Sequence, residues 1–373
     1  MARGYDGQLL KPDFAARQPD SAARDLIDAL AGPLDVRGWG WGERSRTWTA
    51  VTASVLLAAV AGFCAHNWYA GETAALWLGI AAVVLTGAGA GVGTLAARSG
   101  QRAPGAALLL LGGILGVAAA WEAVQGGSAR LAAVGLTAAA VLALLGLCTG
   151  LGRGGLIGAA SVALAVGAWE LGLALTTPAR TGVVLGFVSL LVLGALPRIA
   201  LMAAGLTRLD DQRSGGTPVS RHQVAAALGA THRELAPATV VMAASAGAAG
   251  VLAVHTPGLW TVLAALLLCV VLCSRARAYP LAVEVVALLA AGLAVCVRVV
   301  LLWATGGGAP VLALVALGVL AVLPVAVLAV RVPDPLRARL RRWLDLVESV
   351  SVVVLIPVAL GAFGLYSLLF GAA

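Results

Sequence analysis

Apolar runs follow one another along almost the whole chain, and each is close to the length that a helix needs to cross a bilayer, about 20 residues. The eleven runs occupy residues 48–68, 73–95, 104–124, 130–149, 154–174, 181–204, 237–255, 258–273, 280–303, 310–330 and 346–370. Charged residues make up 11% of the chain and the mean hydropathy is +0.97, whereas a soluble domain has about 25% charged residues. The pattern predicts an all-α polytopic membrane protein with eleven transmembrane helices.

The arginines between the runs predict the orientation. With the N-terminus on the cytoplasmic side, all but three of the 25 basic residues lie in the cytoplasmic segments between the runs or at the cytoplasmic ends of the runs. The three on the outer side are Arg130, Arg180 and Arg298. Basic residues accumulate in cytoplasmic loops. We therefore expect an odd number of spans in the plasma membrane, a cytoplasmic N-terminus and a C-terminus outside.

The spacing of the runs divides the chain into four parts. They are a cytoplasmic N-terminal segment with a short amphipathic helix (1–47), a six-helix membrane half (48–204), a cytoplasmic loop (205–236) and a five-helix membrane half (237–373). Prolines stand at or near the start of several runs, Pro237 among them, as fits the first turn of a helix, where the missing N–H costs no hydrogen bond.

Small residues within the runs predict close helix contacts. The stretch "GAGAGVG" (87–93) holds two interleaved glycine pairs at GxxxG spacing, Gly87/Gly91 and Gly89/Gly93. Such pairs let helix backbones approach each other closely in a membrane. They lie within a span and follow no strand, which excludes a nucleotide-binding loop.

The stretch "RLRRWLDLVES" (339–349) concentrates charge directly before the last run. Arg337, Arg341, Asp345 and Glu348 recur at spacings of three and four, so on a helix they share a face and can pair. Trp343 suits the level of the lipid headgroups. We interpret the stretch as a cytoplasmic interfacial helix that either fixes the topology of the last span or docks a partner.

The sequence predicts no catalytic residue, no metal site and no cofactor. Its histidines stand apart without ligand spacing, and its five cysteines lie in apolar runs, where free thiols are commonly buried. Nucleic-acid binding is not expected either, because the basic patches are not interleaved with exposed aromatic residues.

Ionisable residues inside the runs lie toward their ends. Glu284 stands about one turn into the ninth run and Arg298 near the outer end of the same run. Ion-coupled transporters place their coupling groups at the midplane, so this distribution favours a scaffold. Glu284 is expected to pair with Arg277 or with a neighbouring subunit.

Two alternative functions remain: a secondary transporter or permease for a small solute, and a lipid-modifying enzyme, which would need a clustered acidic or histidine motif.

Three stretches resemble the EccD family, the eleven-span membrane component of actinobacterial type VII (ESX) secretion systems. They are "LPRIALMAAGL" (196–206), "RARAYPLAVEVVALLAAGLAV" (275–295) and "RRWLDLVESVSVVVLIPVALGAFGLYSLL" (341–369). The resemblance covers roughly residues 20–370 and includes the order of the motifs and the number of spans. Family members usually begin with a ubiquitin-like domain. Residues 1–47 show no alternating strand pattern, so we expect that domain to be missing here.

The resemblance implies a non-enzymatic scaffold or channel-wall subunit that exports folded WxG-type proteins. It also implies dimers of this chain, membrane lipids and the EccB, EccC and EccE-like subunits as partners, with EccC as the FtsK-like ATPase. The residues expected to dock these partners are Arg198, Arg221, Arg233, Arg275, Arg277, Arg337, Arg339, Arg341, Arg342, Asp345 and Glu348.

Overall fold

The computed structural model describes residues 43–68, 71–96, 103–149, 151–203, 221–305, 310–329 and 334–366. The chain divides into two compact units, Met1–Ala53 and Ser54–Ala373. The described part of the first unit is the beginning of helix α2. The packed helices lie within Ser54–Ala373, called the second unit.

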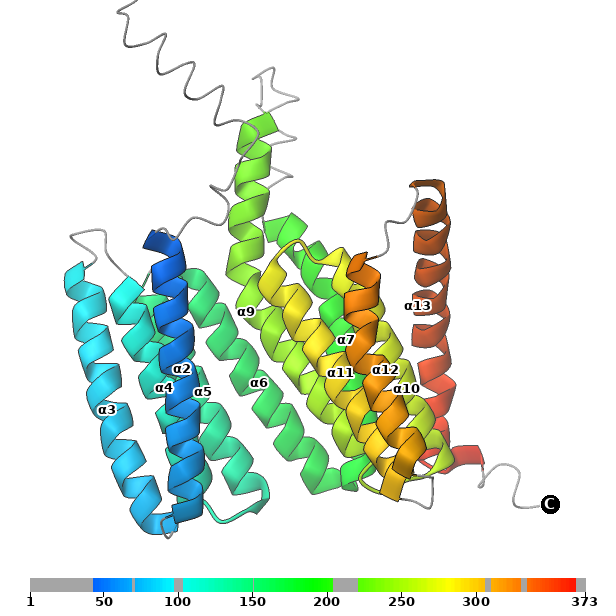
Figure 1. Ribbon diagram of the computed structural model, residues 1–373, viewed down its shortest axis with the longest axis horizontal. Coiled ribbons are helices and arrows are strands. Elements are labelled where there is room, and N and C mark those ends of the chain that lie inside the picture. Colours follow the sequence, from blue (N-terminus) through cyan, green and yellow to red (C-terminus); the bar gives the residue numbers. More distant parts are fainter. Residues whose placement is uncertain are drawn as a thin grey trace, which may run out of the picture. The chain divides into compact units, whose positions relative to one another are not determined.

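Eleven α-helices and one short 3-10 helix form the described part of the chain. They are α2 (Glu43–Trp68), α3 (Gly71–Ala96), α4 (Ala103–Ala123), α5 (Gly127–Cys148), α6 (Arg153–Leu175), α7 (Pro178–Ala203), α9 (Arg221–Ala253), α10 (Leu259–Arg275), η2 (Ala276–Ala278), α11 (Ala282–Thr305), α12 (Pro310–Ala329) and α13 (Asp334–Ala362). Successive helices run up and down the second unit (Figure 1).

The helices match the predicted runs one to one, which confirms the all-α polytopic membrane fold. Within the described residues, nine helices are long and apolar enough to cross a membrane. The other two, α2 and α12, contain shorter apolar stretches, Thr52–Trp68 and Val311–Leu320. The chain is therefore a multi-pass membrane protein.

Helix α9 differs from the prediction at its beginning. It starts at Arg221, so the end of the predicted loop continues into the span without a break, and Pro237 lies inside the helix rather than in its first turn. The ring of Pro237 lies against Gly158 of α6, where an added Cβ would stand 2.7 Å from the Pro237 Cβ. The glycine thus leaves room for the proline at this crossing.

Helix α13 joins two predicted elements. The expected interfacial helix and the last span form one continuous helix that includes Pro357. It ends at Ala362, before the predicted limit of residue 370, and Gly364 follows with φ of 77°. Glycine adopts this left-handed conformation without a steric penalty, which makes it a common helix terminator.

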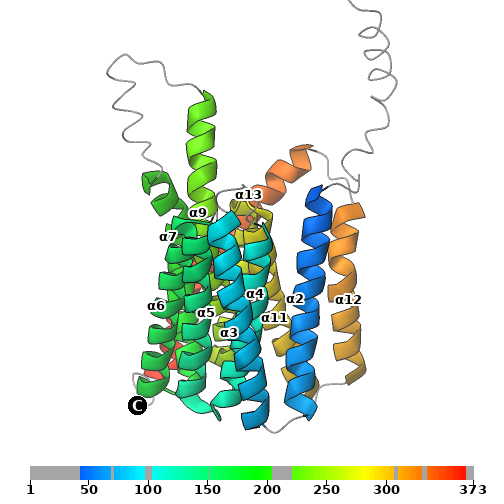
Figure 2. The same cartoon turned by 90° about the vertical axis from the view of Figure 1, so that its left-hand side faces the viewer.

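The core of the second unit lies around α9, which packs against α6, α7, α10 and α11. Many of its buried residues are small, and Ala243, Ala246, Ala249 and Ala253 are each 0% exposed. Small side chains bring the helix axes close together, and dispersion contacts replace the hydrophobic effect that lipid does not supply. Helices α3 to α6 lie side by side in the other half, each packed on the next (Figure 2).

One of the two GxxxG pairs in α3 forms the contact with its neighbours. An added Cβ on Gly89 would lie 2.8 Å from the backbone nitrogen of Leu109 in α4, and one on Gly93 would lie 2.6 Å from the carbonyl oxygen of Cys148 in α5. Gly87 and Gly91 have nothing within 4 Å of the same position. Close backbone approach therefore depends on Gly89 and Gly93.

We expect Gly89→Ala to destabilise the protein and Gly91→Ala to leave its stability unchanged or slightly raised. Overpacking a close contact costs about 1–3 kcal/mol, whereas alanine in open space improves helix propensity by about 1 kcal/mol. Thermal unfolding of the two purified variants in mild detergent measures the difference. Equal melting temperatures would contradict a close α3–α4 contact at Gly89.

Candidate functional site

Most of the predicted docking residues lie at one end of the second unit. This end, called the basic end, is where α6, α9 and α13 begin and where α7 and α10 finish; α9 and α13 both begin at the top of Figure 1. The described side chains of Arg198, Arg233, Arg339 and Arg342 are exposed there. The side chains of Arg221, Arg337 and Arg341 lie outside the described part of the structure.

Arg275, the last residue of α10, connects three helices at the basic end. Its Nε donates to Glu348 Oε1 of α13 at 3.1 Å, and its Nη1 donates to the carbonyl oxygen of Leu190 in α7. Gly194 of α7 leaves space for the guanidinium, because a Cβ there would lie 3.0 Å from Nη2. The arginine and glutamate side chains are 17% and 22% exposed. The pair therefore has a structural role within the chain.

Two hydroxyl groups complete this cluster, which we call the polar junction (Ser274, Arg275, Tyr279 and Glu348). The Ser274 hydroxyl donates to Glu348 Oε2 at 3.3 Å. The Tyr279 hydroxyl donates to the carbonyl oxygen of Leu193 at 2.7 Å. Together with Arg275, these bonds fasten α13 and the end of α10 to α7.

Tyr279 is buried, at 7% exposure, and its burial raises its pKa to about 12. The positive charge of Arg275 opposes this rise, and the carboxylates of Glu284 and Glu348 add to it. The phenol therefore remains protonated well above its ordinary pKa, which preserves its hydrogen bond to the Leu193 carbonyl.

The predicted intramembrane ionisable residues occupy different surroundings. Glu284, at 1% exposure, lies in the first turn of α11, where its Oε2 accepts the N–H of Leu281 at 3.4 Å. A carboxylate in the first turn of a helix is stabilised by the helix dipole. Arg298 lies half-buried farther along α11, away from the basic end.

A second ion pair lies at the rim of the polar junction. Arg277 Nη2 donates to Asp345 Oδ1 at 3.3 Å, with side-chain exposures of 34% and 71%. Asp345 and Glu348 were predicted to pair along α13, but the structure pairs both with arginines at the end of α10 and in η2. A pocket of about 310 Å³ lies between α13 on one side and the end of α10 with η2 on the other. It is lined by Ser274, Arg277, Ala278, Asp345 and Glu348.

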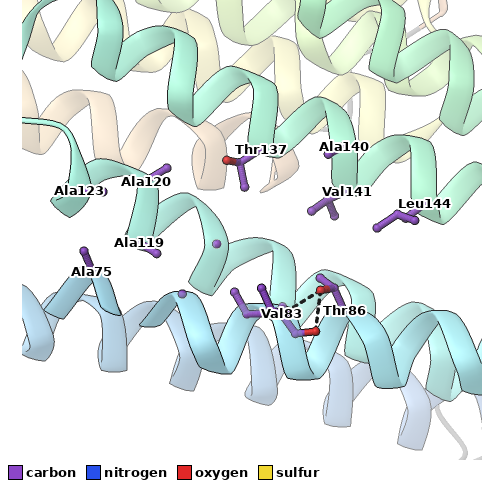
Figure 3. A pocket seen from close by; sticks show the side chains of 14 residues that line it. Ala75, Val83, Thr86, Ala119, Ala120, Ala123, Thr137, Ala140, Val141 and Leu144 are labelled. Atoms are coloured by element: carbon purple, nitrogen blue, oxygen red, sulfur yellow. Dashed lines mark hydrogen bonds between the residues drawn. The ribbon is translucent and has the colours of Figure 1, made fainter. Parts of the chain in front are cut away.

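A groove of about 430 Å³ lies among α3, α4 and α5 (Figure 3). Its described lining is apolar except for Thr86 and Thr137. The Thr86 hydroxyl bonds to the Ala82 carbonyl at 2.7 Å, and the Thr137 hydroxyl bonds to the Ala133 carbonyl at 2.8 Å. Because both hydroxyls bond within their own helices, the groove suits an apolar guest and offers little to a polar solute.

Further polar side chains join helices inside the membrane region. The Trp169 indole N–H of α6 donates to the Ser245 hydroxyl of α9 at 3.1 Å, and the Ser189 hydroxyl of α7 lies 3.1 Å from the same Ser245 oxygen. Hydrogen bonds of this kind hold helices together in lipid. Among the described residues, no group of three or more histidine, cysteine or acidic side chains is arranged to hold a metal ion.

Sequence reasoning singled out Arg275 and Glu348 of the polar junction but missed its two hydroxyl groups. Ser274 and Tyr279 flank the arginines of "SRARAY" and were not singled out, although a tyrosine at a span boundary usually finds a hydrogen-bond partner when it is buried. The three-helix contact of Trp169, Ser189 and Ser245 left no signal of spacing, since its members are 76 and 56 residues apart in the chain.

The fold and the junction define a multi-pass helical membrane protein whose described polar groups mainly connect its own helices. The family model for the EccD-like transmembrane domain matches residues 45–372. The chain therefore belongs to the EccD family, as the motifs in its sequence indicated.

Two solved structures show the same fold at low sequence identity. A chain of "protomer 1 of the ESX-3 core complex" aligns with a TM-score of 0.59 and 19% identity, over 98% of this chain and 84% of that one. A chain of the "MycP5-free ESX-5 inner membrane complex, State II" aligns with a TM-score of 0.51 and 17% identity, over 82% of this chain and 75% of that one. None of the curated proteins compared matches the sequence.

We expect Glu348→Ala to lower the free energy of unfolding by about 1.5–3 kcal/mol, because it removes hydrogen bonds to a charged group and leaves Arg275 without its carboxylate. Asp345→Ala is the matched control on the same helix. It breaks an exposed pair, for which the loss is below about 1 kcal/mol. Denaturant unfolding in detergent compares them. An equal loss in both variants would mean that the Arg275–Glu348 pair does not hold α13.

The raised pKa of Tyr279 predicts a loss of stability in alkali. A group that is protonated more strongly in the folded state stabilises it fully below the unfolded pKa, here 10, and loses this effect as the pH rises to about 12. The loss for two pH units is about 3 kcal/mol. We expect the stability difference between the wild type and Tyr279→Phe to shrink across this range in unfolding experiments. A difference that is independent of pH would contradict the buried phenol.

Proposed function

We propose that this protein is a non-enzymatic membrane scaffold or channel-wall subunit of a type VII (ESX) protein secretion complex. In this role it contributes to the export of folded WxG-type proteins, with energy from a partner FtsK-like ATPase. The observation that carries the proposal is the match to the EccD-like transmembrane domain across residues 45–372. The folds of chains from the ESX-3 and ESX-5 complexes support it.

The use of polar groups inside the second unit supports a scaffold. Trp169, Ser189 and Ser245 bond to one another between helices, and the two threonines of the α3–α5 groove bond within their own helices. A permease for a small polar solute needs such groups to face its substrate. These side chains instead bond between or within helices and stabilise a fixed arrangement.

Exposed apolar faces support association within a larger oligomer. Helix α12 packs mainly against α11. Its Val311, Leu314, Val319 and Val322 are between 59% and 69% exposed. In a membrane, such a face meets lipid or another helix. We propose that faces of this kind contact lipid, EccB-like and EccE-like subunits, and a second copy of this chain in a dimer.

The basic end is our proposed cytoplasmic docking surface for the ATPase, because arginine accumulates there. The span within α9 begins at Arg233, whereas the helix begins at Arg221. The intervening 12 residues correspond to about 18 Å of helix beyond the span. Arg198 and Arg233 are exposed at its base. This projecting part of α9 is a helix that a cytoplasmic partner can bind.

Native purification tests the function. We expect the chain, produced together with the neighbouring genes of its operon and extracted in mild detergent, to elute as a large assembly that contains an FtsK-like ATPase. Native mass measurement of the particle gives its composition. Recovery as a lone monomer or dimer without ATPase would reject the secretion-complex assignment.

A charge reversal then tests the docking surface separately. Arg233→Glu should reduce the ATPase recovered with the complex, while Arg180→Glu, an exposed arginine at the opposite end, should leave recovery unchanged. Equal recovery with both variants would show that the ATPase docks elsewhere, even if the complex itself forms.

A further inference from the structure

Helix α13 presents two different faces at the basic end. One face is buried against its neighbours: Ser351, Leu355 and Val358 are 6%, 0% and 5% exposed. Asp345 and Glu348 extend this face and pair with Arg277 and Arg275. The acidic side chains of this charged stretch are therefore turned toward α10 and η2.

The opposite face is formed by six exposed residues, which we call the outward stripe. They are Arg339, Arg342, Trp343, Leu346, Val350 and Val353. Arg342 and Trp343 are adjacent and share this face, and the other successive members are three or four residues apart, the period of a single helix face. The stripe begins with charge, continues through an indole and ends in aliphatic side chains.

The two arginines of the stripe form no ion pair within the described part of the chain, where the arginine pairs involve Arg275 and Arg277. A hollow of about 270 Å³ lies beside the stripe, and its described lining is Arg339, Arg342, Trp343 and Leu346. Two arginines, a tryptophan and a leucine thus line one concave surface. Arginine binds phosphate by paired, charge-assisted hydrogen bonds, and this geometry favours it over lysine.

The position of the stripe along α13 places that surface at the membrane boundary. The apolar span within the helix begins at Arg342, and the first turns of α13 extend beyond the ends of α11 and α12 in Figure 1. Trp343 is 66% exposed at this level, where tryptophan is typical of the headgroup region. Leu346, Val350 and Val353 continue the same face into the span, and they are 54%, 51% and 65% exposed.

We propose that the outward stripe binds one anionic phospholipid from the membrane leaflet at the basic end. Arg339 and Arg342 hold its phosphate, Trp343 packs beside the glycerol region, and an acyl chain lies along Leu346, Val350 and Val353. Charge complementarity and the unbroken aliphatic path select a lipid over a soluble anion. This site goes beyond the secretion role and does not depend on it.

Native mass spectrometry of the purified full-length chain tests the site. The protein is titrated in mild detergent with phosphatidylglycerol and, separately, with phosphatidylcholine. We expect the wild type to retain phosphatidylglycerol preferentially, and Arg339→Gln/Arg342→Gln to lose about tenfold of that preference, because each interfacial arginine contributes severalfold to anionic lipid binding. Arg153→Gln, an exposed arginine at the start of α6, should retain it.

A second measurement reports the acyl path. Phosphatidylglycerol with brominated chains should quench tryptophan fluorescence more in the wild type than in Trp343→Phe. If Arg339→Gln/Arg342→Gln lowers the quenching to the level of Trp343→Phe, the headgroup and the acyl chain occupy one site, which supports the proposal.

Three outcomes would overturn the proposal. The first is equal retention of both lipids by the wild type. The second is displacement of phosphatidylglycerol by equimolar inorganic phosphate, which would identify a site for a free anion. The third is an unchanged lipid preference in the Arg339→Gln/Arg342→Gln variant, which would show that the stripe does not hold the lipid.

Discussion

The guanidinium of Arg275 is the interaction on which the basic end depends. It stands where α10 leaves the membrane and bonds at once to a carboxylate of α13 and a backbone carbonyl of α7. A charge at this depth is costly unless it is paired and fully hydrogen-bonded. Gly194 leaves room for the guanidinium, and the Ser274 hydroxyl donates to the same Glu348 carboxylate. With α13 fixed in rotation, its two faces have different surroundings.

Much of the fold could be predicted from the sequence. In lipid every backbone polar group must be hydrogen-bonded within the protein, and an apolar run of this length satisfies the requirement as a helix. Run lengths predicted eleven helices, and arginine positions predicted which helix ends lie together. The residues at which the helices begin and end were less predictable. Pro237 signalled a helix start, yet it lies inside α9, because Gly158 on another helix makes room for its ring. That accommodation depends on a residue 79 positions away, which a local signal does not carry.

The candidate site was predictable as a region but not as a geometry. Arg275 and Arg277 are nearly equivalent in "RAR", but the first is mostly buried against α7 and the second is at the rim. Likewise, Gly89 forms a close contact and Gly91 faces open space, although both occur in GxxxG pairs. In each case the difference comes from rotation of a helix about its axis. That rotation is set by neighbours distant in sequence.

The unbroken course of α9 has a mechanical consequence. Because no loop separates the projecting turns from the span, the projecting turns cannot move independently of the span. The helix packs closely against α6, α7, α10 and α11, with buried alanines at several of these contacts. A displacement of the projecting turns would therefore act on the four transmembrane helices that pack against α9.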